Sequence, residues 1–161
     1  LVFIGGQTGA SDPRNNEAFL RGLREQIDGL GLAGRVHWTG FLSPGRVSAH
    51  LAAADLMVMP YRDGVSLRRG TLMAALAHGR TLITTTPAEA DAAPELRHGD
   101  NVWFVPPGDP AALATAVATL SADPAARARL GHGAREVAGL FDWGRIAGLT
   151  ADFYGGIGIR G

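Results

Sequence analysis

The sequence contains no cysteine and no lysine, and each absence excludes a specific chemistry. Without cysteine, the chain can form neither disulfide bonds nor thiolate metal sites. Without lysine, it cannot form a Schiff base with a carbonyl substrate, and the phosphate loop G-x-x-x-x-G-K-[ST] is impossible. All fifteen basic residues are arginines. Any permanently charged cationic side chain that contacts a ligand must therefore carry a guanidinium group.

Long apolar runs and an excess of charge of one sign are also absent. No stretch approaches the roughly 18 apolar residues that a membrane-spanning helix needs. The 15 basic and 15 acidic residues balance, which argues against a broad nucleic-acid-binding surface. The five histidines are scattered without an H-x-H or H-x-x-x-H pair, so we expect no metal site. The esterase motif G-x-S-x-G is missing too.

The length and composition indicate part of a globular protein. A chain of 161 residues, 46% of them hydrophobic, fits one domain with a single core. The abundance of arginine, alanine and glycine is typical of a GC-rich bacterial genome. The chain begins with "LVFIGG", already inside a strand-like run and without an initiator methionine. We interpret it as a fragment of a longer protein.

Short apolar runs alternate with longer amphipathic stretches along the chain. The expected strands are 1–5, 35–40, 55–60, 81–86 and 102–106. The expected helices are 13–30, 44–53, 72–77, 110–120, 124–138 and 142–154, several of them introduced by an Asp-Pro or Ser-Pro start. This order predicts an α/β fold, a Rossmann-like doubly wound parallel sheet of about five to six strands with helices on both faces. We expect one domain over 1–154 and a flexible tail over 155–161.

Ligands of such sheets bind beyond the carboxyl ends of the strands. The loops that leave these ends are 5–9, 39–43, 60–70 and 84–91, and we expect all of them on one edge. The first, "GGQTG", lacks the G-x-G-x-x-G spacing and the direct entry into a helix that dinucleotide binding requires. Gly5 and Gly6 are better explained by a tight turn or by close approach of the backbone to a ligand.

The stretch "DGVSLRRGTLMAALAHG", residues 63–79, places two cations before an apolar helix. Asp63-Gly64 can form a turn, and Val65 to Arg69 present successive N–H groups at the amino end of the helix, where anions bind. Arg68 and Arg69 add forked donors suited to phosphate oxygens. The alternative is that both arginines are solvated or pair with a surface carboxylate. The helix 72–77 is apolar nearly all round, which predicts burial.

Six segments follow one another in an order that resembles a known family. "LVFIGG", "RVHWTGFLS" and "LAAADLMVMPYRDG" resemble its glycine-turn strand, its V-x-F-x-G strand and its A-D-x-x-x-x-P-S strand. "LMAALAHGRTLITT", "LRHGDNVWFVPPGDPAALATAV" and "FDWGRIA" resemble its L-x-E-A-x-A-x-G-x-P-V-V-x-T, G-x-N-G-x-x-V-x-P-G-D and F-S-W-x-x-x-A segments. The chain is thus similar, from "LVFIGG" to about Tyr154, to the carboxy-terminal donor-binding domain of a GT-B glycosyltransferase of family 4, the retaining glycosyl transferases group 1.

The resemblance implies an enzyme, a glycosyltransferase of hexosyltransferase type. Its substrate would be a nucleoside-diphosphate sugar, with no cofactor and no metal, and the sugar would pass to an acceptor that the sequence does not identify. In that family a second domain holds the acceptor, so the partner would be the protein's own amino-terminal domain. The isolated fragment would be inactive. We expect a cytoplasmic location, with any membrane association through the missing domain.

One departure from the family concerns its E-x7-E motif, whose two glutamates contact the donor sugar and the ribose. Aligned on "LMAALAHG", these positions fall on Ser66 and Ala74, so both carboxylates are missing. Asp63 is the nearest acid, three residues early, and is the best candidate for a catalytic role. Arg68 and Arg69 replace the small and aromatic residues usual there.

The resemblance and the loops together define a set of expected donor-binding residues. Ser66 to Arg69 would bind the diphosphate, Asp63 the sugar hydroxyls, and the backbone of Phe41 and Leu42 the base. The complete set is Gly5, Gly6, Phe41, Leu42, Asp63, Gly64, Val65, Ser66, Leu67, Arg68, Arg69 and Thr71. The main alternative is a degenerate GT-B domain that acts as a binding or scaffolding module. Another doubly wound nucleotide-binding domain, such as half of a sugar-nucleotide epimerase, is a third possibility.

Overall fold

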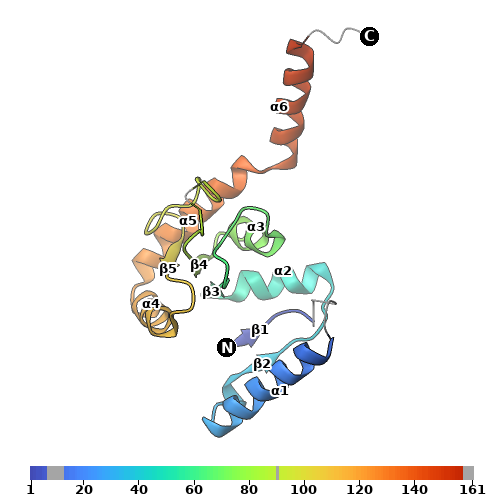
Figure 1. Cartoon of the computed structure of the whole chain (residues 1–161). Coiled ribbons are helices and arrows are strands. Elements are labelled where there is room, and N and C mark those ends of the chain that lie inside the picture. Colours follow the sequence, from blue (N-terminus) through green and yellow to red (C-terminus); the bar gives the residue numbers. More distant parts are fainter. Residues whose placement is uncertain (7–12, 90, 158–161) are drawn as a thin grey trace. The chain divides into compact units, whose positions relative to one another are not determined.

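The computed structural model describes residues 1–6, 13–89 and 91–157, and its elements follow the predicted order (Figure 1). The strands are β1 (Val2–Phe3), β2 (His37–Trp38), β3 (Leu56–Met59), β4 (Thr81–Thr85) and β5 (Trp103–Val105). The helices are α1 (Pro13–Gly29), α2 (Pro44–Ala53), α3 (Gly70–Ala77), α4 (Pro110–Ala122), α5 (Pro124–Leu140) and α6 (Trp143–Gly156), with a 3-10 turn at Ala33–Arg35. The expected cap of α1, Asp12, lies outside the described residues.

Residues cluster into two compact units, Leu1–His50 and Leu51–Gly161. In the first unit β1 pairs with β2 in parallel, Val2 opposite His37 and Phe3 opposite Trp38. Both strands are shorter than the sequence predicts. The apolar stripe of α1 is also narrower than expected: Leu20, Leu23 and Ile27 are half-buried, whereas Phe19 and Leu30 are exposed.

The second unit contains a parallel sheet in the order β3-β4-β5. The central strand β4 is buried at all five positions, as expected for a strand covered on both faces. Its threonines are compatible with burial because their hydroxyls donate to carbonyl oxygens: Thr84 Oγ1 to Met59 O and Thr85 Oγ1 to Tyr61 O, both at 2.8 Å. The strands of both units pair in parallel, and a helix separates each strand from the next except between β4 and β5, which confirms the predicted α/β class.

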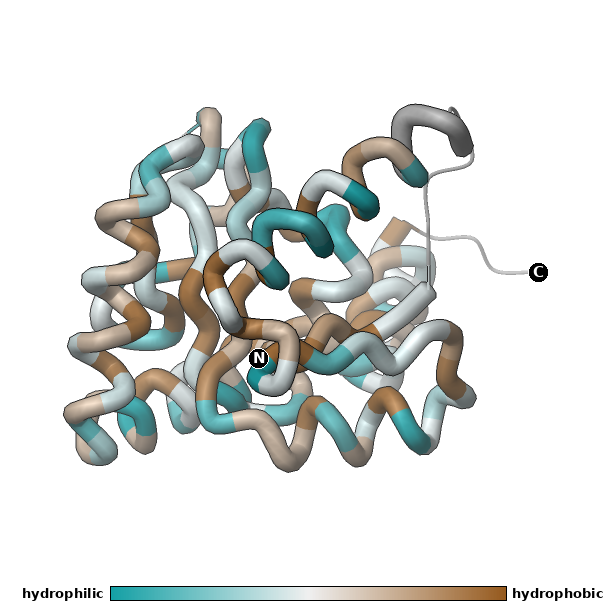
Figure 2. Tube along the Cα trace, turned by 90° about the horizontal axis from the view of Figure 1, so that it is seen from below, coloured by the Kyte–Doolittle hydropathy of each residue, from teal (hydrophilic) through white to brown (hydrophobic). Residues whose placement is uncertain are grey.

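Helices α4 and α5 cover this sheet and close its main core. Ile83 and Val105 of the strands pack with Ala116, Leu120, Ala126 and Leu130 of the two helices. Both helices begin as predicted, with proline in the first turn and an aspartate cap. Asp109 accepts from Ala112 N at 2.8 Å and Asp123 from Ala126 N at 2.9 Å. Brown and teal residues alternate along the helical turns in Figure 2, the pattern of helices with one apolar face.

The last helix, α6, starts after the cap Asp142 and continues to Gly156. Two residues of the predicted tail, Gly155 and Gly156, are therefore helical, and residues 158–161 lie outside the described part. Among the described helices, none combines the length and hydropathy that crossing a bilayer requires. The single domain expected over 1–154 stays a prediction.

Close packing between α5 and the turn that precedes β4 gives a test of this fold. Gly131→Ala is expected to lower the free energy of unfolding by about 1–3 kcal/mol, because the added Cβ would lie 2.5 Å from the carbonyl oxygen of Gly79. Gly139→Ala on the same helix is the control, since its Cβ would meet no described atom within 4 Å. Urea denaturation compares the two variants, and equal losses of stability would contradict the packing argument.

Candidate functional site

The loop 60–70 leaves the carboxyl end of β3, and the loop after β4 leaves the same edge because the two strands are parallel. Backbone contacts tie the two loops together. Leu67 N donates to Ala92 O at 3.4 Å, and Thr85 at the end of β4 holds Tyr61 O. Two of the four predicted ligand-edge loops are thus brought together within the second unit. Residues 7–9 of the first loop lie outside the described part.

Gly64 fixes the path of the loop. Its φ is +79°, and a Cβ there would lie 2.7 Å from Thr86 O and 2.6 Å from Ala88 N. Both the left-handed backbone and the close approach require glycine. The predicted Asp63-Gly64 turn therefore lies directly against the loop that follows β4.

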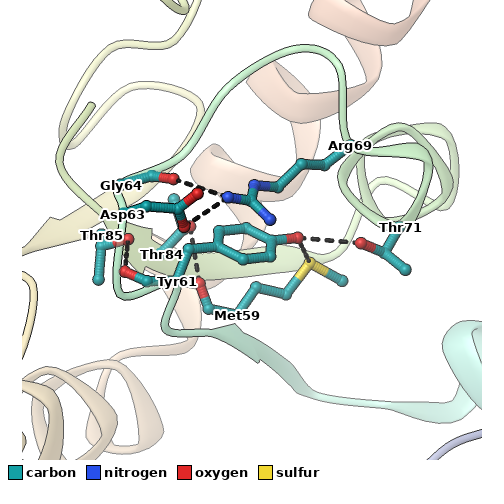
Figure 3. Close-up of polar contacts among 8 residues, drawn as sticks. All are labelled: Met59, Tyr61, Asp63, Gly64, Arg69, Thr71, Thr84 and Thr85. Atoms are coloured by element: carbon teal, nitrogen blue, oxygen red, sulfur yellow. Dashed lines mark hydrogen bonds and ion pairs between the residues drawn. The ribbon is translucent and has the colours of Figure 1, made fainter. Parts of the chain in front are cut away.

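Asp63 and Arg69 form an ion pair across this loop (Figure 3). Arg69 Nη2 donates to Asp63 Oδ1 at 2.5 Å and to Gly64 O at 3.4 Å. The same guanidinium lies over the ring of Tyr61, its Cζ 4.0 Å from the ring centroid, a favourable cation–π arrangement. The two ends of the loop are thereby clamped together.

Tyr61 is the residue that the sequence analysis missed. Its hydroxyl is 2.9 Å from Thr71 Oγ1, at the start of α3, and donates to Met59 Sδ at 3.4 Å. The side chain links the end of β3 to α3 and supports Arg69. The only available signal was an aromatic residue directly after Pro60 at the end of a strand.

The structure separates the two arginines that the sequence analysis treated as a pair. Arg69 is the residue before α3, and its guanidinium folds back onto Asp63, which is the alternative interpretation for this residue. Arg68 is exposed, and its guanidinium makes no hydrogen bond or ion pair within the described residues. Assigning both guanidinium groups to a diphosphate therefore conflicts with the arrangement of Arg69 in this structure.

The backbone around the start of α3 retains free donors. Leu67 N and Arg69 N are used in hydrogen bonds to Ala92 O and Ser66 O. The N–H groups of Ser66, Arg68, Gly70 and Thr71 make no hydrogen bond within the described residues. Free N–H groups at a helix start attract anions. The helix itself is buried through Leu72, Ala75 and Leu76, as predicted, and forms a firm base for the loop.

Among the described residues of the loop 60–70, the charged side chains are the Asp63 carboxylate and the guanidinium groups of Arg62, Arg68 and Arg69. Ser66 and Ala74, the positions aligned with the E-x7-E glutamates, are both half-buried and carry no charge. The hydrogen bond from Arg69 lowers the pKa of the Asp63 carboxyl below its usual 3.8. Asp63 is therefore a carboxylate at neutral pH and can accept hydrogen bonds only.

The remaining expected site residues lie in the first unit. Gly5 has a φ of +117°, and its N–H donates to Thr39 Oγ1 at 3.1 Å. Gly6 packs beside Phe41, whose side chain is 91% exposed. Leu42 is half-buried. A donor site that combines these residues with the loop 60–70 stays a prediction.

The family model described as "Glycosyl transferases group 1" matches residues 1–123. The chain belongs to this family of glycosyltransferases. The expected resemblance is thereby confirmed. The match ends at Asp123, the cap of α5, and includes the whole of the loop 60–70.

Solved structures and a curated relative agree with this family. The Anabaena protein HepE, crystallised with UDP, has a TM-score of 0.79 at 22% identity, over 96% of this chain and 40% of its own. Sucrose-phosphate synthase from Thermosynechococcus elongatus has a TM-score of 0.72 at 28% identity, over 92% and 37%. These structural similarities confirm the expected GT-B type of the fold.

One curated relative is a D-inositol 3-phosphate glycosyltransferase from Streptomyces bingchenggensis, 38% identical over 104 residues. The matched segment is 63% of this chain and only 22% of that protein. This glycosyltransferase chain therefore corresponds to a small part of its curated relative.

The clamp between Asp63 and Arg69 can be tested by titration. We expect the pKa of Asp63 to lie below 3.8 and Arg69→Gln to raise it toward that value, because the donor to the carboxylate is lost. The pair therefore stabilises the fold above the usual pKa, and this stabilisation is lost as the pH falls through the lowered value. Carbon NMR of the Asp63 carboxyl measures the shift, with Arg68→Gln as control. An unchanged pKa in Arg69→Gln would show that the clamp is absent.

Proposed function

We propose that this chain is the donor-binding domain of a retaining glycosyltransferase of hexosyltransferase type. It binds a nucleoside-diphosphate sugar as substrate, without cofactor or metal. The acceptor is held by the protein's own amino-terminal domain, so residues 1–161 alone are inactive. The location proposed is the cytoplasm, with any membrane association through the acceptor domain. The observation that carries the proposal is the loop 60–70, with free N–H groups at the start of α3 beside an unpaired arginine.

The diphosphate is assigned to the backbone of Ser66, Arg68, Gly70 and Thr71 and to the side chain of Arg68. Free N–H groups at the start of a helix add to the positive end of its dipole. The exposed guanidinium of Arg68 supplies the charge that a diphosphate needs. When the sugar leaves, negative charge grows on the diphosphate, and fixed donors stabilise this charge without reorganising.

Asp63 and Arg69 take a different role from Arg68 in this proposal. Arg69 holds the Asp63 carboxylate in place within the loop 60–70. An ionised carboxylate accepts several hydrogen bonds, so Asp63 can receive a sugar hydroxyl while it retains Arg69. This would replace the contact that the missing glutamate makes in the family. Gly5, Gly6, Phe41 and Leu42 keep their proposed contacts with the donor and its base.

A degenerate, non-catalytic GT-B domain is the second candidate. This alternative rests on Ser66 and Ala74, two uncharged residues at the positions aligned with the glutamates of the E-x7-E motif. Loss of these carboxylates affects contacts to the sugar and the ribose. The N–H groups that would hold the phosphates are unaffected. Such a module would bind nucleotides without transferring sugar.

Replacing Arg68 tests the diphosphate assignment. Arg68→Ala is expected to weaken binding of UDP or GDP by about tenfold, because a charge-assisted contact to phosphate is lost. Arg129→Ala, an exposed arginine on α5, is the matched control and should bind normally. Calorimetry on the full-length protein gives both affinities. Equal binding by the two variants would remove Arg68 from the donor site.

Turnover separates the enzyme from the module. We expect the full-length protein to hydrolyse or transfer at least one nucleoside-diphosphate sugar, and residues 1–161 alone to do neither, because the acceptor side of the cleft is contributed by another domain. Release of UDP or GDP from a panel of sugar nucleotides is measured by a coupled assay. Binding without any release would favour the non-catalytic module. Sugar transfer by residues 1–161 alone would contradict the assignment of the acceptor site to another domain.

A further inference from the structure

A second polar site lies in the same unit, at the opposite end of the sheet from the loop 60–70. It is a pocket of about 360 Å³ between the amino ends of β3 and β4 and helix α5. Its lining is Asp55, Gly79, Arg80, Thr81, Arg127, Ala128, Gly131, His132 and Arg135. We call it the basic pocket. The donor loop follows the carboxyl end of β3, whereas Asp55 precedes the amino end, so about four residues, roughly 13 Å of strand, separate the two sites.

The basic pocket has an excess of positive charge. Arg80, Arg127 and Arg135 face a single carboxylate, Asp55. None of these four residues belongs to an ion pair within the described part of the chain. The three positive charges and one negative charge of these four residues leave a net charge of two positive units. An excess of this kind in a concave site favours an anionic occupant.

Of the three arginines, Arg127 is held by uncharged groups. Arg127 Nη1 donates to Leu120 O at 2.6 Å and to Ser121 O at 2.8 Å, near the end of α4. Arg135 lies over Gly79, where any Cβ would collide with its side chain. Arg80 Nε is buried and has no hydrogen-bond partner among the described residues. The carbonyl groups orient Arg127 without neutralising its positive charge. Arg80 retains one N–H group that can donate to a ligand.

The walls of the basic pocket are fixed by close backbone packing. Gly131 of α5 lies against Gly79, and a Cβ there would lie 2.5 Å from Gly79 O. Thr81, at the start of β4, donates from Oγ1 to Arg127 O at 3.0 Å. The spacing between helix α5 and the turn before β4 is therefore fixed. A site whose walls are already set loses little entropy when it binds a ligand.

We propose that the basic pocket binds a phosphate monoester, separately from the nucleotide-sugar donor. A phosphate monoester carries up to two negative charges near neutral pH, which matches the net charge of the lining. Guanidinium groups bind phosphate through forked donors, and three arginines belong to the lining of this pocket. The volume lies near the lower limit for small-molecule sites, so it accommodates a sugar phosphate rather than a whole nucleotide sugar.

Calorimetry on the full-length protein tests the site with inorganic phosphate and glucose 6-phosphate, and with glucose at matched ionic strength as the uncharged probe. We expect glucose 6-phosphate to bind and glucose not to bind. The double variant Arg80→Gln, Arg135→Gln should weaken binding by about tenfold or more. Arg129→Gln, on the same helix outside the lining, should bind as the unaltered protein does. Equal affinity in the double variant and in Arg129→Gln would overturn the proposal.

The variant Asp55→Asn keeps the test decisive if the double variant fails to fold. Removing the only carboxylate of the lining should tighten glucose 6-phosphate binding, by roughly threefold. An unchanged or weaker affinity would count against the site. UDP should neither compete with glucose 6-phosphate nor lose affinity in the double variant. Competition by UDP would place the phosphate in the donor loop and overturn the proposal, whereas failure of UDP to bind at all concerns only the donor function.

The phosphate monoester can belong to a dissolved molecule or to a lipid headgroup, and a second arm distinguishes them. Vesicles of phosphatidylcholine with phosphatidic acid are sedimented with the full-length protein, and vesicles of phosphatidylcholine alone are the control. Binding of glucose 6-phosphate without sedimentation supports the site and assigns it to a soluble ligand. Sedimentation that the double variant abolishes supports the site and assigns it to a lipid. Absence of binding in both arms overturns the proposal.

Discussion

The parallel pairing of β3 with β4 is the constraint on which the rest of the second unit depends. Four residue pairs, from Leu56–Thr81 to Met59–Thr84, align the strands so that both end at the same edge. The hydroxyls of Thr84 and Thr85 then extend the pairing by holding Met59 O and Tyr61 O. These bonds set where the loop 60–70 starts. A change of register would move the start of that loop and the clamp within it.

The two ends of this strand pair have different electrostatics. At the carboxyl end, Asp63 offsets Arg69 inside the loop, and Arg68, beside the free N–H groups of α3, has no ion pair within the described residues. At the amino end, three arginines and one carboxylate line the basic pocket, and carbonyl groups position Arg127. The same sheet therefore presents one loop where charge is partly balanced and one pocket where it is not. Only the first is part of the proposed donor chemistry of this glycosyltransferase.

Much of the fold could be predicted because its signals are local. Asp109-Pro110 and Asp123-Pro124 predicted the starts of α4 and α5, since a proline fits the first turn and an aspartate accepts from the backbone two or three residues on. The apolar run of β4 predicted a strand buried on both faces. The sequence signals for where an element ends were weaker than those for where it begins. Gly155 and Gly156 suggested a tail, but α6 includes them, because glycine lowers helix stability without forbidding the conformation.

The sequence by itself determined the α/β class, the family resemblance and the segment in which anion-binding groups would gather. Those features depend on residue order, spacing and local caps, all of which can be read from the sequence. Only the tertiary structure decided how the charges are shared. Asp63 and Arg69 meet because the loop folds back over Tyr61. Arg80, Arg127 and Arg135 line one pocket because α5 packs against the turn before β4. A side chain's partner depends on the path of the backbone, and spacing along the chain does not determine that path.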